Sequence, residues 1–289
     1  MKTRWWQRVA AWLTTWRRPP NIPTPLWHAV VEQHPVLARR SPSEQKHLQH
    51  LASAFLAQKE FAGGQGLVVT DAMAVGIAAQ ACLPLLYWGP DALDWYADFV
   101  GVVVHPDEVV AQRTVVDDSG VVHQYRETLA GEAMQGGPVM LAWSHVLGGH
   151  TGPAVGHNLV IHEFAHKLDM RHKGAYHPPD GCPALPPGFM GLTSTVAAHR
   201  FWRDTLYQAW EDHQQRTEMA QRFGGPAPWL DPYGATSPVE FFAVACEAYF
   251  ADPEGFAQAC PTVWPLLLAF FQPGPLPALS AGSAPQQSL

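Results

Sequence analysis

Charged residues are scarce in this sequence. Asp, Glu, Lys and Arg together make up 15% of its 289 residues, the net charge is −7, and no region is strongly basic. Proteins whose main activity is to bind nucleic acid gather Lys and Arg on one face, so we expect no direct contact with nucleic acid. With 47% apolar residues, the chain has enough hydrophobic side chains for a substantial core.

Cysteine is also rare. The four cysteines, Cys82, Cys182, Cys246 and Cys260, form no CxxC pair and no closely spaced framework. This spacing excludes a zinc ribbon and a disulfide scaffold. Reduced thiols are typical of the cytoplasm, where we expect this protein to be. Cys182 could be a metal ligand or a reactive thiol, but an ordinary loop cysteine is the simpler interpretation.

No run of apolar residues approaches the roughly 20 that a membrane-crossing helix needs. The first segment, residues 1–24, begins like a signal peptide, but its apolar part covers only residues 9–16 and is followed by Arg17 and Arg18 instead of a cleavage site. Its tryptophans and arginines would suit a helix on an anionic membrane surface; a packed or mobile terminal helix is the simpler interpretation. Residues 273–289 are mostly Pro, Ala, Ser and Gln, which predicts a disordered tail.

The remaining residues, 25–272, are predicted to form one domain of the α+β class, mainly helical. Apolar residues at helical spacing, capping residues and prolines supply the helix signals. They predict helices at residues 27–33, 41–57, 72–83, 196–223, 239–251 and 254–271. Three β-branched runs, at residues 100–105, 121–126 and 138–146, predict a small mixed or antiparallel sheet.

The most informative motif is HExxH, formed by His162, Glu163 and His166. The apolar residues around it recur at helical spacing, and positions four apart share one face of a helix, so both imidazoles can reach one metal ion. Zinc takes neutral imidazole nitrogen readily, and a catalytic zinc site uses three protein ligands and an open position for water. Glu163 would lie beside that water and accept its proton. The alternative is a buried helix whose histidines are satisfied by other protein groups.

The motif supplies two ligands, so a third must come from elsewhere. His172 lies six positions after His166, as in the extended HExxHxxGxxH pattern, but Asp169 stands where that pattern has its glycine. Glu240 and Glu247 lie seven positions apart on an apolar helix, and hence on nearly the same face. A carboxylate there costs free energy unless it is paired or bound to metal. Position alone does not choose between these two glutamates, and the one that is not a ligand could orient a ligating histidine.

Two segments flank the motif. Residues 138–146 could be an edge strand that accepts an extended peptide by strand addition, or an ordinary core strand, and the sequence favours neither. Residues 171–194 are rich in proline and glycine. They form a long connection of the kind that covers a site as a lid or is disordered.

Several blocks of the sequence resemble the Mlc titration factor A family of zinc peptidases. The blocks are residues 67–71, 77–82, 137–143, 160–170, 231–236 and 240–247. They include the runs VIHEFAHKLDM, DPYGAT and EFFAVACE. HExxH alone would be a weak signal, but these blocks in this order are specific, and they extend the resemblance over about residues 25 to 272.

The resemblance implies that His162, His166 and Glu240 bind one zinc ion and that Glu163 is the general base. It also implies that Tyr233, seven positions before Glu240, faces the zinc. The Tyr233 phenol could then stabilise the oxyanion formed in peptide hydrolysis; the alternative is a turn tyrosine packed on the surface. Kinship with the catalytic domain of anthrax lethal factor implies a zincin-like fold, with the sheet beside the HExxH helix. The proline-rich loop is long for the family.

We therefore expect a monomeric, cytoplasmic zinc metallopeptidase that acts on peptides as an aminopeptidase. The resemblance further implies a regulatory role, in which the protein binds an Mlc-type transcriptional repressor and relieves repression of the sugar phosphotransferase system. A second hypothesis is a zinc-stabilised anti-repressor whose hydrolytic activity is incidental. Glu163 favours the enzyme, because a purely structural zinc site needs no general base.

Overall fold

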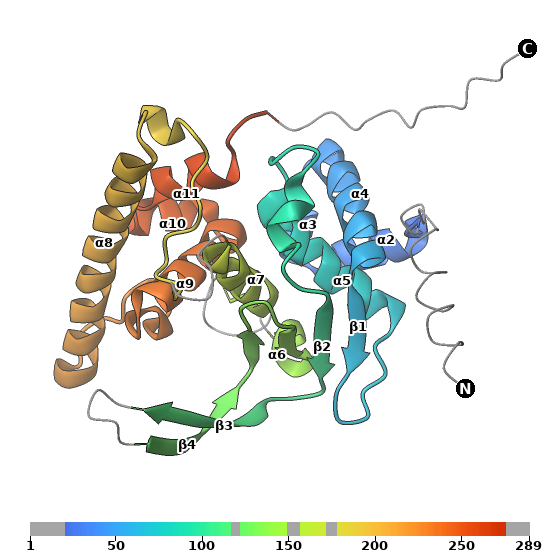
Figure 1. The fold of residues 1–289 in the computed structure, drawn as a ribbon, viewed down its shortest axis with the longest axis horizontal. Helices are drawn as coiled ribbons and strands as arrows, with labels where there is room; N and C mark the ends of the chain where they lie inside the picture. Colours follow the sequence, from blue (N-terminus) through green and yellow to red (C-terminus); the bar gives the residue numbers. More distant parts are fainter. Residues whose placement is uncertain (1–20, 117–121, 149–156, 172–177, 276–289) are drawn as a thin grey trace, which may run out of the picture.

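The computed structural model describes residues 21–116, 122–148, 157–171 and 178–275. Helix α7 (Leu159–Met170) runs through the middle of the molecule, between two groups of helices (Figure 1). The first group is α2 (Thr24–Gln33), α3 (Pro35–Ala38), α4 (Pro42–Gln58) and α5 (Asp71–Cys82). The second group is α8 (Thr195–Phe223), α9 (Pro238–Ala251), α10 (Pro253–Ala259) and α11 (Trp264–Phe271). Because α7 packs against both α5 and α9, the HExxH motif lies at the centre of the fold.

The helices begin where the sequence signals place them. The Ser41 hydroxyl accepts a hydrogen bond from the N–H of Glu44, and the Glu44 carboxylate accepts one from the N–H of Ser41, which fixes the first turn of α4. Thr70 caps α5 by accepting from the N–H of Met73. The predicted helices in this half of the chain are confirmed.

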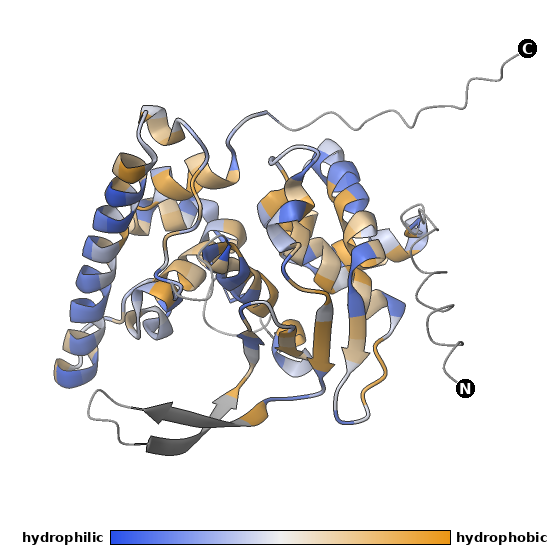
Figure 2. Cartoon of the chain, viewed as in Figure 1, coloured by the Kyte–Doolittle hydropathy of each residue, from blue (hydrophilic) through white to orange (hydrophobic). Residues whose placement is uncertain are grey.

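The C-terminal helices are confirmed with one change. The polar helix predicted over residues 196–223 is α8, whose outer face is hydrophilic (Figure 2) while Trp202 and Leu206 on its inner face are buried. The helical segment predicted over residues 254–271 is two helices, because a turn at residues 261–263 separates α10 from α11. The predicted helix over 239–251 is α9.

A small mixed sheet lies beside α7, as predicted. Its strands are β1 (Glu60–Gly63), β2 (Gly101–His105), β6 (Val139–Ala142) and β5 (Gly131–Ala133), in that order. The first three are parallel, and β5 pairs antiparallel to β6. Two of the strands, β1 and β5, were not predicted, because four and three residues are too few to show an alternating pattern.

Two strand predictions need correction. The run at residues 138–146 is a strand only over Val139–Ala142, and the chain then turns into helix α6 (Trp143–Gly148). Since β6 lies between β2 and β5, the edge-strand alternative for this run is wrong, and β5 forms that edge. The described part of the run at residues 121–126 lies in β4 (Val122–Leu129), which pairs with β3 (Val109–Val116) in a separate two-stranded sheet. Alternation predicts a strand but not its partner.

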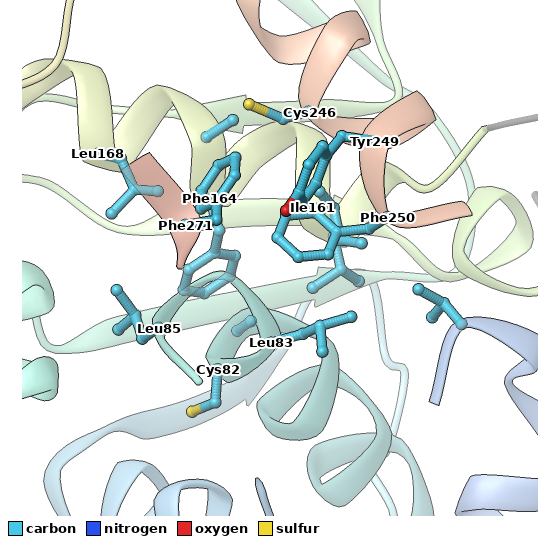
Figure 3. Packing of buried hydrophobic residues seen from close by; sticks show 14 of the residues in the cluster. Cys82, Leu83, Leu85, Ile161, Phe164, Leu168, Cys246, Tyr249, Phe250 and Phe271 are labelled. Carbon is cyan, nitrogen blue, oxygen red and sulfur yellow. The ribbon is translucent and has the colours of Figure 1, made fainter. Parts of the chain in front are cut away.

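One hydrophobic cluster joins both groups of helices, with members from Ile22 to Phe271. Figure 3 shows part of it, where side chains of α5, α7, α9 and α11 meet. Phe164 of α7 packs against the rings of Phe55 and Tyr96, with centroids 5.8 and 5.0 Å away. The apolar side of the HExxH helix is therefore fixed by the core. No helix in the described part of the chain is both long and apolar enough to cross a membrane.

The described part of the proline-rich loop, residues 178–194, is packed against the protein. The Gly181 carbonyl accepts a hydrogen bond from the Trp202 indole at 2.8 Å, and the Gly181 N–H donates to the Asp169 carboxylate at 2.7 Å. Phe189 is buried against Trp202. The prediction of a disordered segment is wrong for these residues, because the apolar side chains among the prolines anchor them. The alternative of a lid stays a prediction. Residues 1–20, 117–121, 149–156, 172–177 and 276–289 lie outside the described residues, so the predictions of a terminal helix and a disordered tail are not tested.

Candidate metal and catalytic site

The two motif histidines and Glu240 meet between α7 and α9. The Nε2 atoms of His162 and His166 lie 3.1 Å apart, and the Glu240 Oε2 atom lies 3.1 Å from the first and 3.4 Å from the second. Asn158 caps α7 by accepting a hydrogen bond from the N–H of Ile161, about one helical turn before His162. Among the described residues, these three side chains are the group of three or more His, Cys, Asp and Glu that could hold a metal ion.

The chemistry of these donors fits a catalytic zinc ion, which takes imidazole nitrogens and a carboxylate oxygen. All three groups are largely buried, so their charges are weakly screened. Burial lowers the pKa of His162, but its hydrogen bonds to Glu240 and Glu247 outweigh this and raise the pKa well above its ordinary value. Burial likewise raises the pKa of Glu240, and the two histidines more than reverse this, holding it well below its usual range. Glu240 is therefore an ionised carboxylate.

Glu247 contacts the other side of His162. Its Oε1 atom lies 2.7 Å from His162 Nδ1, and its Oε2 atom accepts a hydrogen bond from the Asn158 N–H at 2.5 Å. A carboxylate on Nδ1 fixes the ring orientation and leaves Nε2 free to face Glu240. The structure thus gives both glutamates of α9 a place: Glu240 faces the histidine pair, and Glu247 lies behind one of them. His172 lies outside the described residues.

Glu163 is buried and points toward β5. A Cβ atom at Gly131 would come within 2.3 Å of the Glu163 Oε1 atom, so the absence of a side chain at Gly131 makes room for the carboxylate. Burial raises the pKa of Glu163, which moves it toward the range that suits a general base near neutral pH. Sequence analysis missed Gly131, although a glycine within a strand often marks a close approach of this kind.

Tyr233 lies at the exposed side of the site, in the short helix η4 (Pro232–Ala235). Its ring centroid is 5.9 Å from that of His162. Asp231 holds the turn: its Oδ1 atom accepts from the N–H of Tyr233 at 2.7 Å, and its Oδ2 atom lies 2.5 Å from His157 Nε2. This hydrogen bond lowers the pKa of Asp231 and raises that of His157. The sequence showed Asp231 only as part of a turn, and it gave no signal for His157.

Cys182 is not part of this group. It is buried in the loop after α7, with its sulfur 3.2 Å from His199 Nδ1. The structure therefore brings together six of the residues singled out from the sequence, namely His162, Glu163, His166, Tyr233, Glu240 and Glu247. Two imidazoles and a carboxylate can hold a cation there, with a buried carboxylate and a phenol beside it.

Comparison with known proteins agrees with this geometry. A family model described as "Glucose-regulated metallo-peptidase M90" matches residues 3–272. Mlc titration factor A of Klebsiella pneumoniae (strain 342) is 37% identical over 242 residues, which cover 84% of each chain. Mlc titration factor A of Escherichia fergusonii is 35% identical over 251 residues, 87% of each chain, and that of Enterobacter sp. (strain 638) is 34% identical over 245 residues, 85% of each chain. The matched residues of the family model include α7 and α9.

Proposed function

The chain belongs to the family of glucose-regulated metallo-peptidases M90, and from this membership we propose that it is a zinc-dependent, aminopeptidase-like hydrolase of peptides. In this proposal, His162, His166 and Glu240 hold one zinc ion, within a zincin-like arrangement of α7 and the sheet. The observation that carries it is the convergence of two imidazole nitrogens and one carboxylate oxygen, each within 3.4 Å of the others, near the buried Glu163.

Zinc, when bound, supplies a Lewis acid that polarises a peptide carbonyl and makes water acidic enough to be deprotonated near neutral pH. Glu163 accepts the proton from that water and passes it to the leaving amine. Its burial supports this role, because a carboxylate with a raised pKa can both take up and release a proton near pH 7. Tyr233 donates its phenol hydrogen to the developing oxyanion from the exposed side of His162.

Strand β5 supports a peptide as substrate. It is the last strand of the sheet in the described part of the chain, and Gly131 places it directly against Glu163. An extended peptide that paired with this edge would run past the general base, with its backbone held by the N–H and C=O groups of the strand. Strand addition by a peptide is therefore proposed at β5, and not at residues 138–146.

The test is metal content by elemental analysis, combined with peptide hydrolysis. We expect about one zinc per chain in the wild type, as for a single three-ligand site. Glu240→Ala should lose the ion, whereas Glu247→Ala should keep it with weaker affinity, because it removes only the partner of His162 Nδ1. Glu163→Gln should keep zinc and lose hydrolysis. Absence of zinc after reconstitution, or hydrolysis by Glu163→Gln at the wild-type rate, would sink the proposal.

The relatives' name, Mlc titration factor A, supports a second role. We propose that the protein, a cytoplasmic monomer, also binds an Mlc-type repressor and so affects the sugar phosphotransferase system. The rival is a zinc-stabilised anti-repressor with incidental hydrolysis. Repressor binding by Glu163→Gln, measured beside the wild type, separates the two roles: equal affinity shows that binding does not need catalysis. No binding by either protein would remove the regulatory role and leave the peptidase untouched.

A further inference from the structure

A cavity lies at the end of α9 opposite to Glu240. It has a volume of about 140 Å³ and opens between the segment after α5, the C-terminal end of α9, and α11. Its wall is mainly aromatic, formed by Tyr87, Tyr249, Trp264 and Phe271. Figure 3 shows Tyr249 and Phe271 close to this region, with Leu83 and Phe250. A cavity of roughly this volume has room for a benzene-sized molecule.

Arg40 is the charged residue among those that line the cavity. Its Nε atom is buried and has no hydrogen-bond partner within the described part of the chain, where no carboxylate lies within 4 Å of its guanidinium either. Glu44 is close enough to feel the charge of Arg40, but its oxygens accept hydrogen bonds from the Tyr87 hydroxyl and from the Ser41 N–H. A buried donor on a cation costs free energy until an acceptor meets it.

One further polar group of the cavity, the Tyr249 hydroxyl, has a hydrogen to donate, whereas the Tyr87 hydroxyl donates its hydrogen to Glu44. The Tyr249 hydroxyl accepts a hydrogen bond from the Gln272 side-chain amide at 3.3 Å, so its own hydrogen remains available. Among the lining residues there is no aspartate or glutamate. The cavity therefore combines aromatic walls with a single positive charge, and this combination selects a ligand that carries a negative charge on a flat apolar body.

We propose that this cavity binds a small aromatic carboxylate. The carboxylate pairs with the guanidinium of Arg40, whose planar fork matches two carboxylate oxygens. The ring packs among Tyr87, Tyr249 and Trp264. The site is independent of the metal centre, because none of its lining residues belongs to the histidine–glutamate group. A ligand there would contact Tyr249 and Phe250 in the last turn of α9.

The probe is benzoate, titrated into the full-length zinc-loaded protein by calorimetry, beside benzamide, which has the same shape without the charge. Benzoate should saturate at one site and bind at least about tenfold more tightly than benzamide. Arg40→Gln should weaken benzoate binding by about tenfold or more. The matched control is Arg39→Gln, since Arg39 is exposed and does not line the cavity; it should bind as the wild type does.

The outcomes are distinct. Equal affinity for benzoate and benzamide, or unchanged benzoate binding in Arg40→Gln, overturns the proposal, and so does the absence of saturable binding. Benzoate is also a possible zinc ligand, so binding that disappears in Glu240→Ala while it persists in Arg40→Gln places the ligand at the metal centre and likewise overturns the proposal. If Arg40→Gln does not fold, the comparison of benzoate with benzamide on the wild type still decides, together with Arg40→Lys, which should bind more weakly because it lacks the fork.

Discussion

Two neighbouring residues of α7, His166 and Lys167, are both buried, but they differ in how many of their polar atoms have a partner. The ammonium of Lys167 contacts three oxygens: Asp98 Oδ2 at 3.2 Å and the carbonyls of Met134 and Gly137 at 2.7 and 3.0 Å. Each of its hydrogens thus has an acceptor. His166 instead turns its Nε2 atom toward His162 and Glu240, and its Nδ1 atom has no partner in the described part of the chain.

The lysine cluster, formed by Lys59 and Lys167 with their partners, has an acceptor or a ring beside each ammonium group. The histidine cluster, formed by His162, His166 and Glu240, leaves His166 Nδ1 without a partner in the described part of the chain. Lys59 completes the former: its ammonium donates to the carbonyls of Tyr96 and Phe99 at 2.5 and 2.6 Å and lies 4.0 Å above the Phe99 ring, while Lys167 lies 4.5 Å from the same ring. In the histidine cluster, three groups that donate electron pairs to metals point at one place. Buried charge with all its partners present indicates a structural role, and buried donors that converge indicate a ligand.

The largest effect should come from Lys167→Met. It leaves two carbonyls and Asp98 without their donor, so the free energy of unfolding should fall by about 3–5 kcal/mol, as for a buried pair that loses one partner. Urea unfolding measures this, and the exposed Lys46→Met is the control, with a change below about 0.5 kcal/mol. Folded Lys167→Met should still bind zinc. If this variant loses zinc without losing stability, the two clusters have been assigned the wrong way round.

Gly131→Ala should mainly reduce activity, whereas Lys167→Met should mainly reduce stability. The new Cβ atom would displace the Glu163 carboxylate, so kcat/KM for a peptide should fall by about 100-fold, the scale of a small misplacement of a catalytic group. Zinc content should not change, because the ligands are untouched. Gly101→Ala is the matched control in the same sheet: its Cβ would lie 3.4 Å from Pro138, an ordinary contact. Equal activity in both variants would show that Glu163 is not the group that limits turnover.

Sequence predicted the histidine cluster much better than the lysine cluster, and the reason is physical. HExxH and the two glutamates of α9 are spaced by helix geometry, which can be read locally. The partners of Lys167 are backbone carbonyls about 30 residues away, in a turn whose strand β5 is too short to predict. Gly131 and the link from Asp231 to His157 depend in the same way on contacts between distant segments. Local periodicity contains no information on such contacts.

The lysine cluster also predicts a pH dependence. Burial lowers the pKa of Lys59 to about 8, from 10.5. Between these two values the unfolded chain binds more protons than the folded one, so stability rises with pH as Lys59 loses its charge in the folded state. Burial raises the pKa of the Cys82 thiol well above its ordinary value, and this works in the opposite direction as pH rises. The contribution of Lys59 is therefore measured as the difference in free energy of unfolding between the wild type and Lys59→Met, in which the Cys82 contribution cancels.

From pH 7 to pH 9.5, the free energy of unfolding of the wild type should rise by about 2 kcal/mol relative to Lys59→Met. Denaturant unfolding of both proteins at both pH values gives the four free energies of unfolding required. An equal change in the two proteins would show that the contacts to Tyr96, Phe99 and the Phe99 ring keep Lys59 charged at pH 9.5.

Asp231 contacts both His157 and the backbone N–H of Tyr233, so it can position the Tyr233 phenol beside the histidine cluster. Asp231→Asn keeps an acceptor for the N–H of Tyr233 but loses the charged partner of His157, so the turn should hold the phenol less firmly. We expect kcat to fall about tenfold with zinc content and KM little changed. The decisive measurement is the double variant: if Asp231 acts by positioning the phenol, Asp231→Asn should cost nothing further in a Tyr233→Phe background. Additive losses of kcat would show that the two residues act independently. Asp231 would then have a structural role, as Lys59 and Lys167 have.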